Sequence, residues 1–97
     1  MKNGVKHDEG KNRLDLIPME SIWEIGRVFT YGAERYGENN WKNLENPESR
    51  CMAAALRHLA KYQIGEKTDD ETGISHLAHA ATNLLFLIFF EKYLKKT

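Results

Sequence analysis

The residues of this sequence best suited to chemistry are three histidines and an asparagine. His76, His79 and Asn83 are spaced at i, i+3 and i+7, which places them on one face of a helix because successive residues turn by about 100°. His58 lies upstream, beside an apolar stripe. Each histidine alone is better explained by a structural role, since buried imidazoles need hydrogen-bond partners. Their convergence predicts a shared polar pocket in which His58 and His76 are the candidate catalytic acid–base groups.

Basic residues able to hold a phosphate lie close to His58 in the sequence. Arg57 and Lys61 share a helix face at i, i+4, where a guanidinium fork and an ammonium could hold one phosphate together. Arg13, from the N-terminal segment, is a third candidate phosphate-binding residue. The alternative is an ordinary solvated basic face paired with Glu48 or Glu66, and this alternative is favoured for Lys61.

An acidic loop precedes the histidine-bearing helix and suggests a metal site. Its carboxylates are Glu66, Asp69, Asp70 and Glu71. Carboxylates so close together repel one another unless a cation neutralises them, and oxygen ligands suit Mg²⁺ or Mn²⁺. The predicted metal-binding residues are Asp70 and Glu71 together with His79 and Asn83. A solvated acidic loop without a metal is an equally good explanation of the sequence alone.

Two aromatic residues, one at the end of the first helix and one in the segment after it, are candidates for stacking on a nucleotide base. Tyr36 and Trp41 could supply the stacking surfaces, and Asn39 and Asn40 could read the edge of the base. Aromatic residues near helix ends are more often part of the core. No Walker loop, GxGxxG motif or Ser–His–Asp spacing is present in the sequence.

The elements that must position these groups are helices, because apolar residues recur with a helical period and no useful stretch alternates like a strand. The sequence predicts an all-α fold with three main helices in a small bundle. The first begins with Pro18 and stops at Gly37. The second has Pro47 at its first position and ends at Gly65, and the third covers about residues 75–93.

Apolar residues also predict which helix faces are buried. On the second helix the expected buried stripe consists of Met52, Ala55, Leu56, Leu59 and Tyr62. On the first helix the expected stripe consists of Ile22, Ile25, Phe29 and Ala33, and Trp23 is expected to widen it. Leu84–Phe90 is apolar on every side, so it is either the central helix or half of a subunit interface. Because a chain of 97 residues has room for one modest core, we expect a homo-oligomer assembled through this C-terminal helix.

Composition limits the function classes. The net charge is zero, from 14 basic and 14 acidic residues, so no global field attracts DNA or RNA and neither is an expected partner. The single cysteine excludes an intrachain disulfide and a cysteine-based zinc site. The sequence has no signal-peptide pattern and no run approaching the roughly 20 apolar residues that span a bilayer. We expect a cytoplasmic protein with no membrane partner, a flexible arm over 1–13 and a single helical domain over 14–97.

Several short motifs, taken in order, resemble a small phage-encoded family. They are Lys11–Pro18, Thr30–Gly37 with Asn40–Trp41, Arg57–His58, Gly65–Glu66, Asp69–Gly73 and His76–Asn83. The family is usually described as the N-terminal domain of dATP/dGTP diphosphohydrolases, and it resembles the all-alpha (MazG-like) nucleotide pyrophosphohydrolases. The resemblance covers about residues 11–90. It implies a helical, magnesium-dependent nucleotide pyrophosphohydrolase in the cytoplasm of the bacterial host.

The sequence departs from the metal-binding pattern that this resemblance implies. The superfamily places an ExxE pair on one helix and an ExxD pair on the next, whereas here Asn83 stands where aspartate is expected and His79 where glutamate is expected. The usual magnesium cage is therefore not preserved. Another cage would be needed, made for example from the loop carboxylates Asp70 and Glu71 with His76 and His79.

Three functions are compatible with these observations. The first is metal-assisted cleavage of a deoxynucleoside triphosphate to monophosphate and pyrophosphate. The second is a non-catalytic phage protein that sequesters nucleotide immune signals such as cyclic oligonucleotides or ADP-ribose derivatives. The third is a structural domain normally fused to a catalytic one. Release of pyrophosphate would indicate the enzyme, and recovery of the intact ligand would indicate the sequestering protein. The absence of any nucleotide-induced thermal shift would favour the structural domain.

Overall fold

The computed structural model describes residues 3–93. Its elements are the 3-10 turn η1 (Leu14–Leu16), α1 (Met19–Tyr36), the 3-10 turn η2 (Asn40–Asn43), α2 (Pro47–Gln63) and α3 (His76–Tyr93). The predicted all-α class with three main helices is confirmed, since no strand is present in the described part of the chain. Residues 94–97 of the predicted domain lie outside the described residues.

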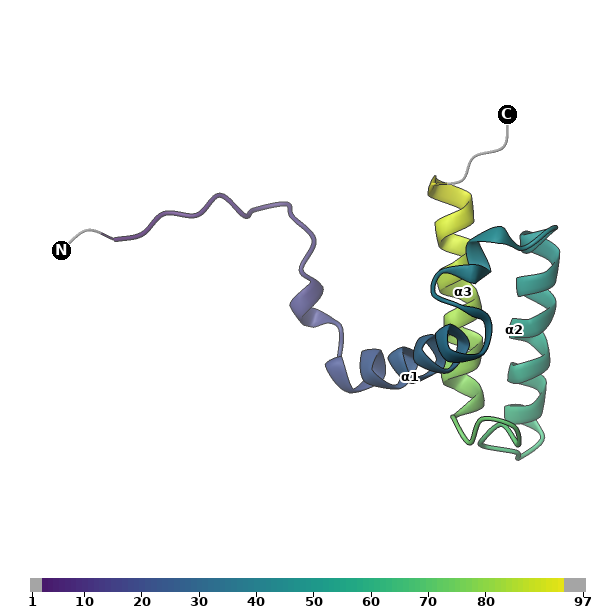
Figure 1. Ribbon diagram of the computed structural model, residues 1–97. Helices are drawn as coiled ribbons and strands as arrows, with labels where there is room; N and C mark the ends of the chain where they lie inside the picture. The colour runs from purple at the N-terminus through teal and green to yellow at the C-terminus, as the bar shows by residue number, and fades with distance from the viewer. Residues whose placement is uncertain (1–2, 94–97) are drawn as a thin grey trace.

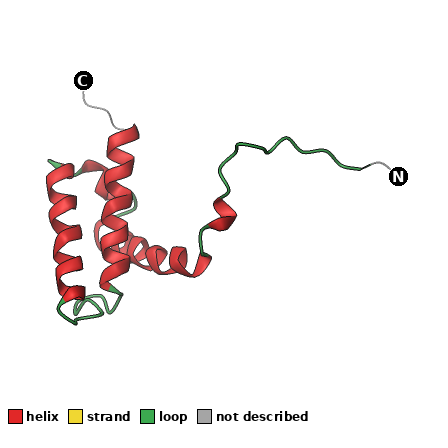
Figure 2. Ribbon diagram, turned by 180° about the vertical axis from the view of Figure 1, so that it is seen from behind, coloured by secondary structure: helices red, strands yellow, loops and turns green. Residues whose placement is uncertain are grey.

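Helices α2 and α3 lie side by side and run in opposite directions, while α1 crosses α3 (Figure 1). The view from behind shows that the N-terminal half of α1 projects away from the α2–α3 pair (Figure 2). Residues 3–13 are exposed and continue outward from there. The radius of gyration is accordingly 17.0 Å, against about 12–13 Å for a compact domain of this length. The second half of α1 therefore lies against the α2–α3 pair, and its first half does not (Figure 2).

Small side chains allow α2 and α3 to approach closely. Cys51 and Ala55 on α2 and Ala78 on α3 are almost fully buried. Because the separation of two helices depends on the side chains at their contact, these small residues favour a close approach of the two backbones. Polar groups on the facing helices can then meet directly, and His58 and His76 do so.

The helix boundaries follow local signals with small differences. Pro18 is the N-cap of α1 and not its first residue, so the predicted start was one residue early. Gly37 ends α1 with φ of 98°, a conformation that glycine adopts without steric cost. Pro47 occupies the first turn of α2 as predicted. The Ser75 hydroxyl caps α3 by accepting a hydrogen bond of 3.0 Å from the Leu77 backbone N–H.

The predicted buried faces of α1 and α2 are partly wrong. Met52, Leu56 and Leu59 are 46%, 56% and 41% exposed, because the small residues of α2, and not its large apolar ones, face α3. Trp23 is 72% exposed, and no residue of α1 is buried. The periodicity located the helices correctly, but on α2 the buried face is the neighbouring one that carries Cys51 and Ala55.

The apolar second half of α3 has one face buried against the rest of the protein and another face exposed. Phe90 is buried, whereas Leu84, Leu85 and Ile88 are 44%, 42% and 53% exposed. The helix contacts both α1 and α2, and assembly of subunits through its exposed side stays a prediction. Among residues 3–93, none of the helices combines the length and the apolar character that crossing a membrane requires.

Candidate functional site

The connection between α2 and α3 is organised by Asp69. Its Oδ2 atom accepts hydrogen bonds from the backbone N–H groups of Glu71 at 3.0 Å and of Thr72 at 2.9 Å. Its own backbone N–H donates to the carbonyl of Ile74 at 2.9 Å. Aspartate commonly closes such local turns because its short side chain reaches backbone N–H groups a few residues ahead. The loop is thereby folded back onto the start of α3.

His58, His76 and Glu66 form a chain of hydrogen bonds from α2 through α3 to the loop. His58 Nδ1 lies 2.9 Å from His76 Nδ1, and His76 Nε2 lies 2.7 Å from Glu66 Oε2. Because a carboxylate only accepts, the proton of the second bond is on His76 Nε2. In the tautomer that donates through Nε2, Nδ1 of His76 accepts from the Nδ1–H of His58. His76 is 2% exposed and uses both ring nitrogens, so it orients His58 and does not itself face solvent.

His79 completes the cluster from the next turn of α3. Its ring stacks on that of His58 with centroids 4.6 Å apart and planes inclined by 10°. His79 Nε2 lies 2.7 Å from Thr72 Oγ1, which ties the loop to the helix. The Asn83 amide donates to the backbone carbonyl of His79 at 3.0 Å. The three histidines therefore converge, as the helical spacing indicated.

The surroundings set the protonation states of the cluster. Desolvation is the main cause that lowers the pKa of both His58 and His79, and the neighbouring imidazole charges add to it. Desolvation would raise the pKa of Asp69, but the Thr72 N–H, the charge of His79 and the Thr72 hydroxyl outweigh it and lower that pKa. At neutral pH the rings of His58 and His79 are therefore uncharged and the carboxylate of Asp69 is ionised, which are the forms that metal binding and proton acceptance require.

His58, His79 and Asp69 line a cleft of about 1080 Å³ between α1 and the α2–α3 pair. The charged residues around this cleft are Glu34, Glu38, Asp69, Glu71 and Arg50. Because carboxylates outnumber the single guanidinium, the cleft repels a bare polyphosphate. A phosphate accompanied by a divalent cation suits the same lining, since magnesium is commonly shared between protein carboxylates and substrate phosphates.

Two turns along α3 from the histidines, the cleft becomes aromatic. Trp41 stacks on Phe86 with ring centroids 4.4 Å apart and planes inclined by 21°. Its other ring contacts, all edge-on, are with Phe29, Phe89 and Phe90. One face of Trp41 is therefore already covered. Tyr36 is 61% exposed, and its hydroxyl accepts a hydrogen bond of 3.0 Å from Arg35. Both predicted base-stacking residues line the cleft.

The basic residues predicted to bind phosphate do not line this cleft. Arg57 is exposed on α2, Lys61 Nζ lies 3.9 Å from Glu66, and Arg13 is held in an ion pair on the exposed N-terminal segment. Arg50, two turns before Arg57, lines the cleft instead. The sequence contained a signal for Arg50, because its position on the helical wheel is close to that of Arg57.

The predicted metal-binding residues are only partly brought together. Asp70 is exposed, Glu71 accepts a hydrogen bond of 2.9 Å from the Tyr31 hydroxyl, and the Asn83 amide bonds to the backbone of His79. A different trio has its ligand atoms within 4.8 Å of one another: His58, Asp69 and His76. Among the loop carboxylates, the structure brings Asp69, and not the predicted Asp70, close to two histidines.

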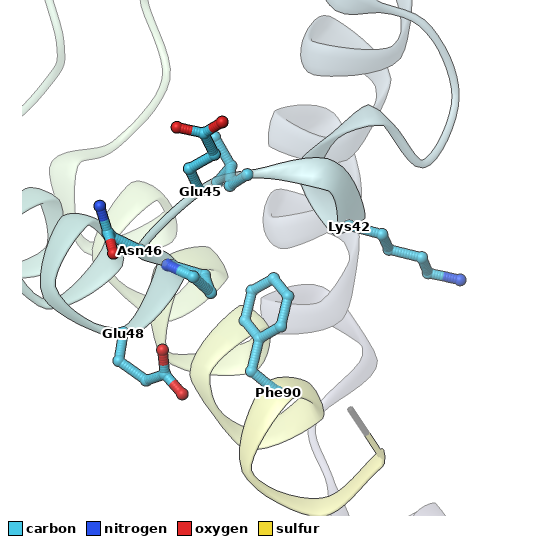
Figure 3. Close-up of a pocket in the computed structure, with 7 residues that line it drawn as sticks. Lys42, Glu45, Asn46, Glu48 and Phe90 are labelled. Atoms are coloured by element: carbon cyan, nitrogen blue, oxygen red, sulfur yellow. The ribbon is translucent and has the colours of Figure 1, made fainter. Parts of the chain in front are cut away.

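A second, smaller hollow of about 520 Å³ lies where the chain enters α2 (Figure 3). Phe90 occupies its centre, the carboxylates of Glu45 and Glu48 lie to one side, and the Lys42 ammonium points away from them. No histidine or cysteine is among the residues that line it. The histidine-lined cleft is therefore the better candidate for chemistry.

Comparison with known proteins agrees with the motifs. Residues 1–97 match the model of a family described as dATP/dGTP diphosphohydrolase, N-terminal. A protein of Salmonella phage PMBT28 named dATP/dGTP diphosphohydrolase is 38% identical over 86 residues, which cover 89% of this chain and 29% of that relative. The chain thus spans less than a third of the relative's length. No solved structure matches it. The resemblance is confirmed, and the chain belongs to the family of dATP/dGTP diphosphohydrolase N-terminal domains.

Proposed function

We propose that the chain binds a purine deoxynucleoside triphosphate together with a divalent cation in the cleft between α1 and the α2–α3 pair, and that it takes part in cleaving it to monophosphate and pyrophosphate. The names of the family and of the phage relative supply the substrate class. The observation that carries the proposal is the cleft of about 1080 Å³, because it joins the imidazole–carboxylate cluster to an aromatic wall. Its volume lies just above the range of about 300–1,000 Å³ that is usual for ligand pockets.

In this proposal the two ends of the cleft receive different parts of the nucleotide. The phosphates lie toward His58 and Asp69, and the Arg50 guanidinium contributes a planar fork of donors. The base lies toward Trp41 and Tyr36, which both line the cleft. This orientation gives polar groups to the charged end of the ligand and aromatic surface to the base.

The reaction proposed is an ordinary hydrolysis. The oxygen of water bonds to the α-phosphorus, the bond from this phosphorus to the bridging oxygen breaks, and pyrophosphate leaves. His58 and His79, kept neutral by their lowered pKa values, are the groups able to accept the proton of water. The predicted Mg²⁺ or Mn²⁺ would be held through carboxylates such as Asp69 and would neutralise phosphate charge when bound.

Binding is tested by isothermal titration of the chain with dGTP and dATP, with Mg²⁺ or Mn²⁺ and again with EDTA. We expect affinity only with the cation, because the carboxylates of the cleft repel the free triphosphate. R50A should weaken binding about tenfold or more, since a hydrogen bond to a charged group contributes about 1.5–3 kcal/mol. R57A is the matched control on the same helix and should bind like the unmodified chain. No binding under any condition would overturn the proposal.

Binding without cleavage is the second candidate, and one observation favours it. The chain corresponds to 29% of the phage relative, so groups needed for hydrolysis can belong to the remainder of such proteins. Release of pyrophosphate, followed with a coupled pyrophosphatase and a phosphate dye, distinguishes the two. Recovery of intact nucleotide after denaturation identifies a binding domain. Adding cyclic oligonucleotides and ADP-ribose derivatives to the same panel tests the sequestering role.

A further inference from the structure

We propose that His58, His76 and Asp69 form a binding site for a transition-metal ion of the Zn²⁺ type, with Glu66 holding His76 in place from behind. The proposal goes beyond nucleotide binding, because it concerns the metal alone. It also differs from the sequence prediction, which placed a magnesium-type site on Asp70, Glu71, His79 and Asn83.

The first argument is the spacing of the donor atoms. One ligand atom from each of the three residues lies within 4.8 Å of the others, and the two imidazole Nδ1 atoms are 2.9 Å apart. Two nitrogens on one tetrahedral zinc ion, each bonded at about 2.0–2.1 Å, are roughly 3.3 Å from each other. The rings therefore need to separate by only a few tenths of an ångström to accept an ion between them.

The second argument is the partner of His76. Imidazoles that bind a metal through one nitrogen usually donate the other N–H to a carboxylate or carbonyl. His76 Nε2 donates to Glu66 Oε2 at 2.7 Å, which leaves Nδ1 as its ligand atom. Since His76 is 2% exposed, packing and this bond fix the ring before any metal arrives.

The third argument concerns Asp69. Both backbone hydrogen bonds that its carboxylate accepts end on Oδ2, so neither of them uses Oδ1, the oxygen that we assign to the metal. Binding needs no change in the charge of His58, because its proton moves from Nδ1 to Nε2 as the ion takes Nδ1.

The ligand types indicate which metal fits. Two imidazole nitrogens and one carboxylate oxygen match zinc and related ions, whereas Mg²⁺ prefers oxygen alone. His58 and Asp69 line the cleft and His76 does not, so the remaining coordination positions face the cleft. His79, which is tied to Thr72 Oγ1 at 2.7 Å, is not among the proposed ligands.

The test uses the whole chain after treatment with EDTA and dialysis, with no nucleotide present. Titration with Zn²⁺ should give one ion per chain, Mg²⁺ alone should bind far more weakly, and Co²⁺ should produce the visible absorption bands of a nitrogen–oxygen site. Because no nucleotide is added, failure here is separate from failure of the proposed function. The absence of Zn²⁺ binding would overturn the metal site.

Matched variants locate the ion. D69N should lower Zn²⁺ affinity at least tenfold, whereas D70N, one residue away in the same loop, should leave it unchanged. E66Q should lower it by about 10- to 100-fold, as loss of an outer-shell partner does elsewhere. H76Q should abolish binding, with H7Q on the exposed N-terminal segment as its control. Far-UV circular dichroism checks folding; if H76Q does not fold, D69N and E66Q still decide. The assignment would be overturned if D69N and D70N lost Zn²⁺ affinity equally, or if only D70N lost it.

Discussion

Replacing Trp41 by alanine tests whether this residue is part of the core or a platform for a base. The structure gives it one stacked partner, Phe86 at 4.4 Å, and three edge-on aromatic neighbours. It joins the segment between α1 and α2 to the second half of α3. W41A should therefore destabilise the fold strongly. W23A removes the same side chain from a position that is 72% exposed and is the matched control.

The expected magnitude follows from burial. Removing a fully buried tryptophan costs about 3–5 kcal/mol, and Trp41 is half-buried, so we expect about 3 kcal/mol. Each aromatic pair contributes roughly 0.5–1.5 kcal/mol beyond burial, which keeps the value from falling much lower. For a domain of this size the loss corresponds to a decrease in Tm of about 12–24 °C. W23A should change the free energy of unfolding by less than about 0.5 kcal/mol.

The assay is urea unfolding followed by far-UV circular dichroism, because either variant removes one of the two tryptophans and alters fluorescence. Nucleotide affinity is measured in parallel on the folded proteins. A W41A variant as stable as W23A would refute the structural role assigned to the aromatic cluster. If its nucleotide affinity alone decreased, Trp41 would be the base-stacking residue that the sequence suggested.

Two further predictions concern acid stability and assembly. In EDTA the free energy of unfolding should decrease as the pH falls below about 6.5, the ordinary pKa of histidine. The reason is that the pKa values of His58 and His79 are lowered in the folded chain, so the unfolded chain takes up protons first. Urea titrations from pH 7 to 5 measure this decrease, and H79Q should reduce the dependence of the free energy of unfolding on pH. If subunits assemble through the exposed side of α3, light scattering should give a multiple of 11.2 kDa for the unmodified chain and a smaller mass for L84E and I88E; a monomeric unmodified chain would contradict the prediction.

The sequence predicted the histidine cluster because the signals involved are local. Helical spacing alone places His76 and His79 on one face, and the cap signals around Pro47 and Ser75 located the two helices that meet there. His58 could be added because it lies beside the apolar stripe of its helix. Its direct bond to His76 depends on the small residues between α2 and α3, whose role the periodicity of large side chains concealed.

The sequence could not show which carboxylate of the loop lies near the histidines, and the reason is physical. Asp69 and Asp70 have the same chemistry and adjacent positions, and the turn's backbone hydrogen bonds decide which of them faces the histidines. Arg50 and Arg57 present the same difficulty on α2, since both lie near one angle and only the path of α1 determines which borders the cleft. Residue type and spacing therefore identified the classes of group in the site but not all its members.

The candidate site takes its carboxylate from the loop, whereas α3 contributes His76 and His79. Carboxylates on helices are positioned by the helices themselves, whereas Asp69 is positioned by a loop that closes through its own side chain. The group proposed to bind metal and the group that folds the loop are thus the same carboxylate, acting through different oxygens. Metal binding at Oδ1 and hydrogen bonding at Oδ2 should reinforce each other, because each holds the carboxylate in the orientation that the other requires. Slower amide hydrogen exchange at Glu71 and Thr72 on addition of Zn²⁺ is the direct sign of this coupling, and unchanged exchange at both would show that the loop and the metal are independent.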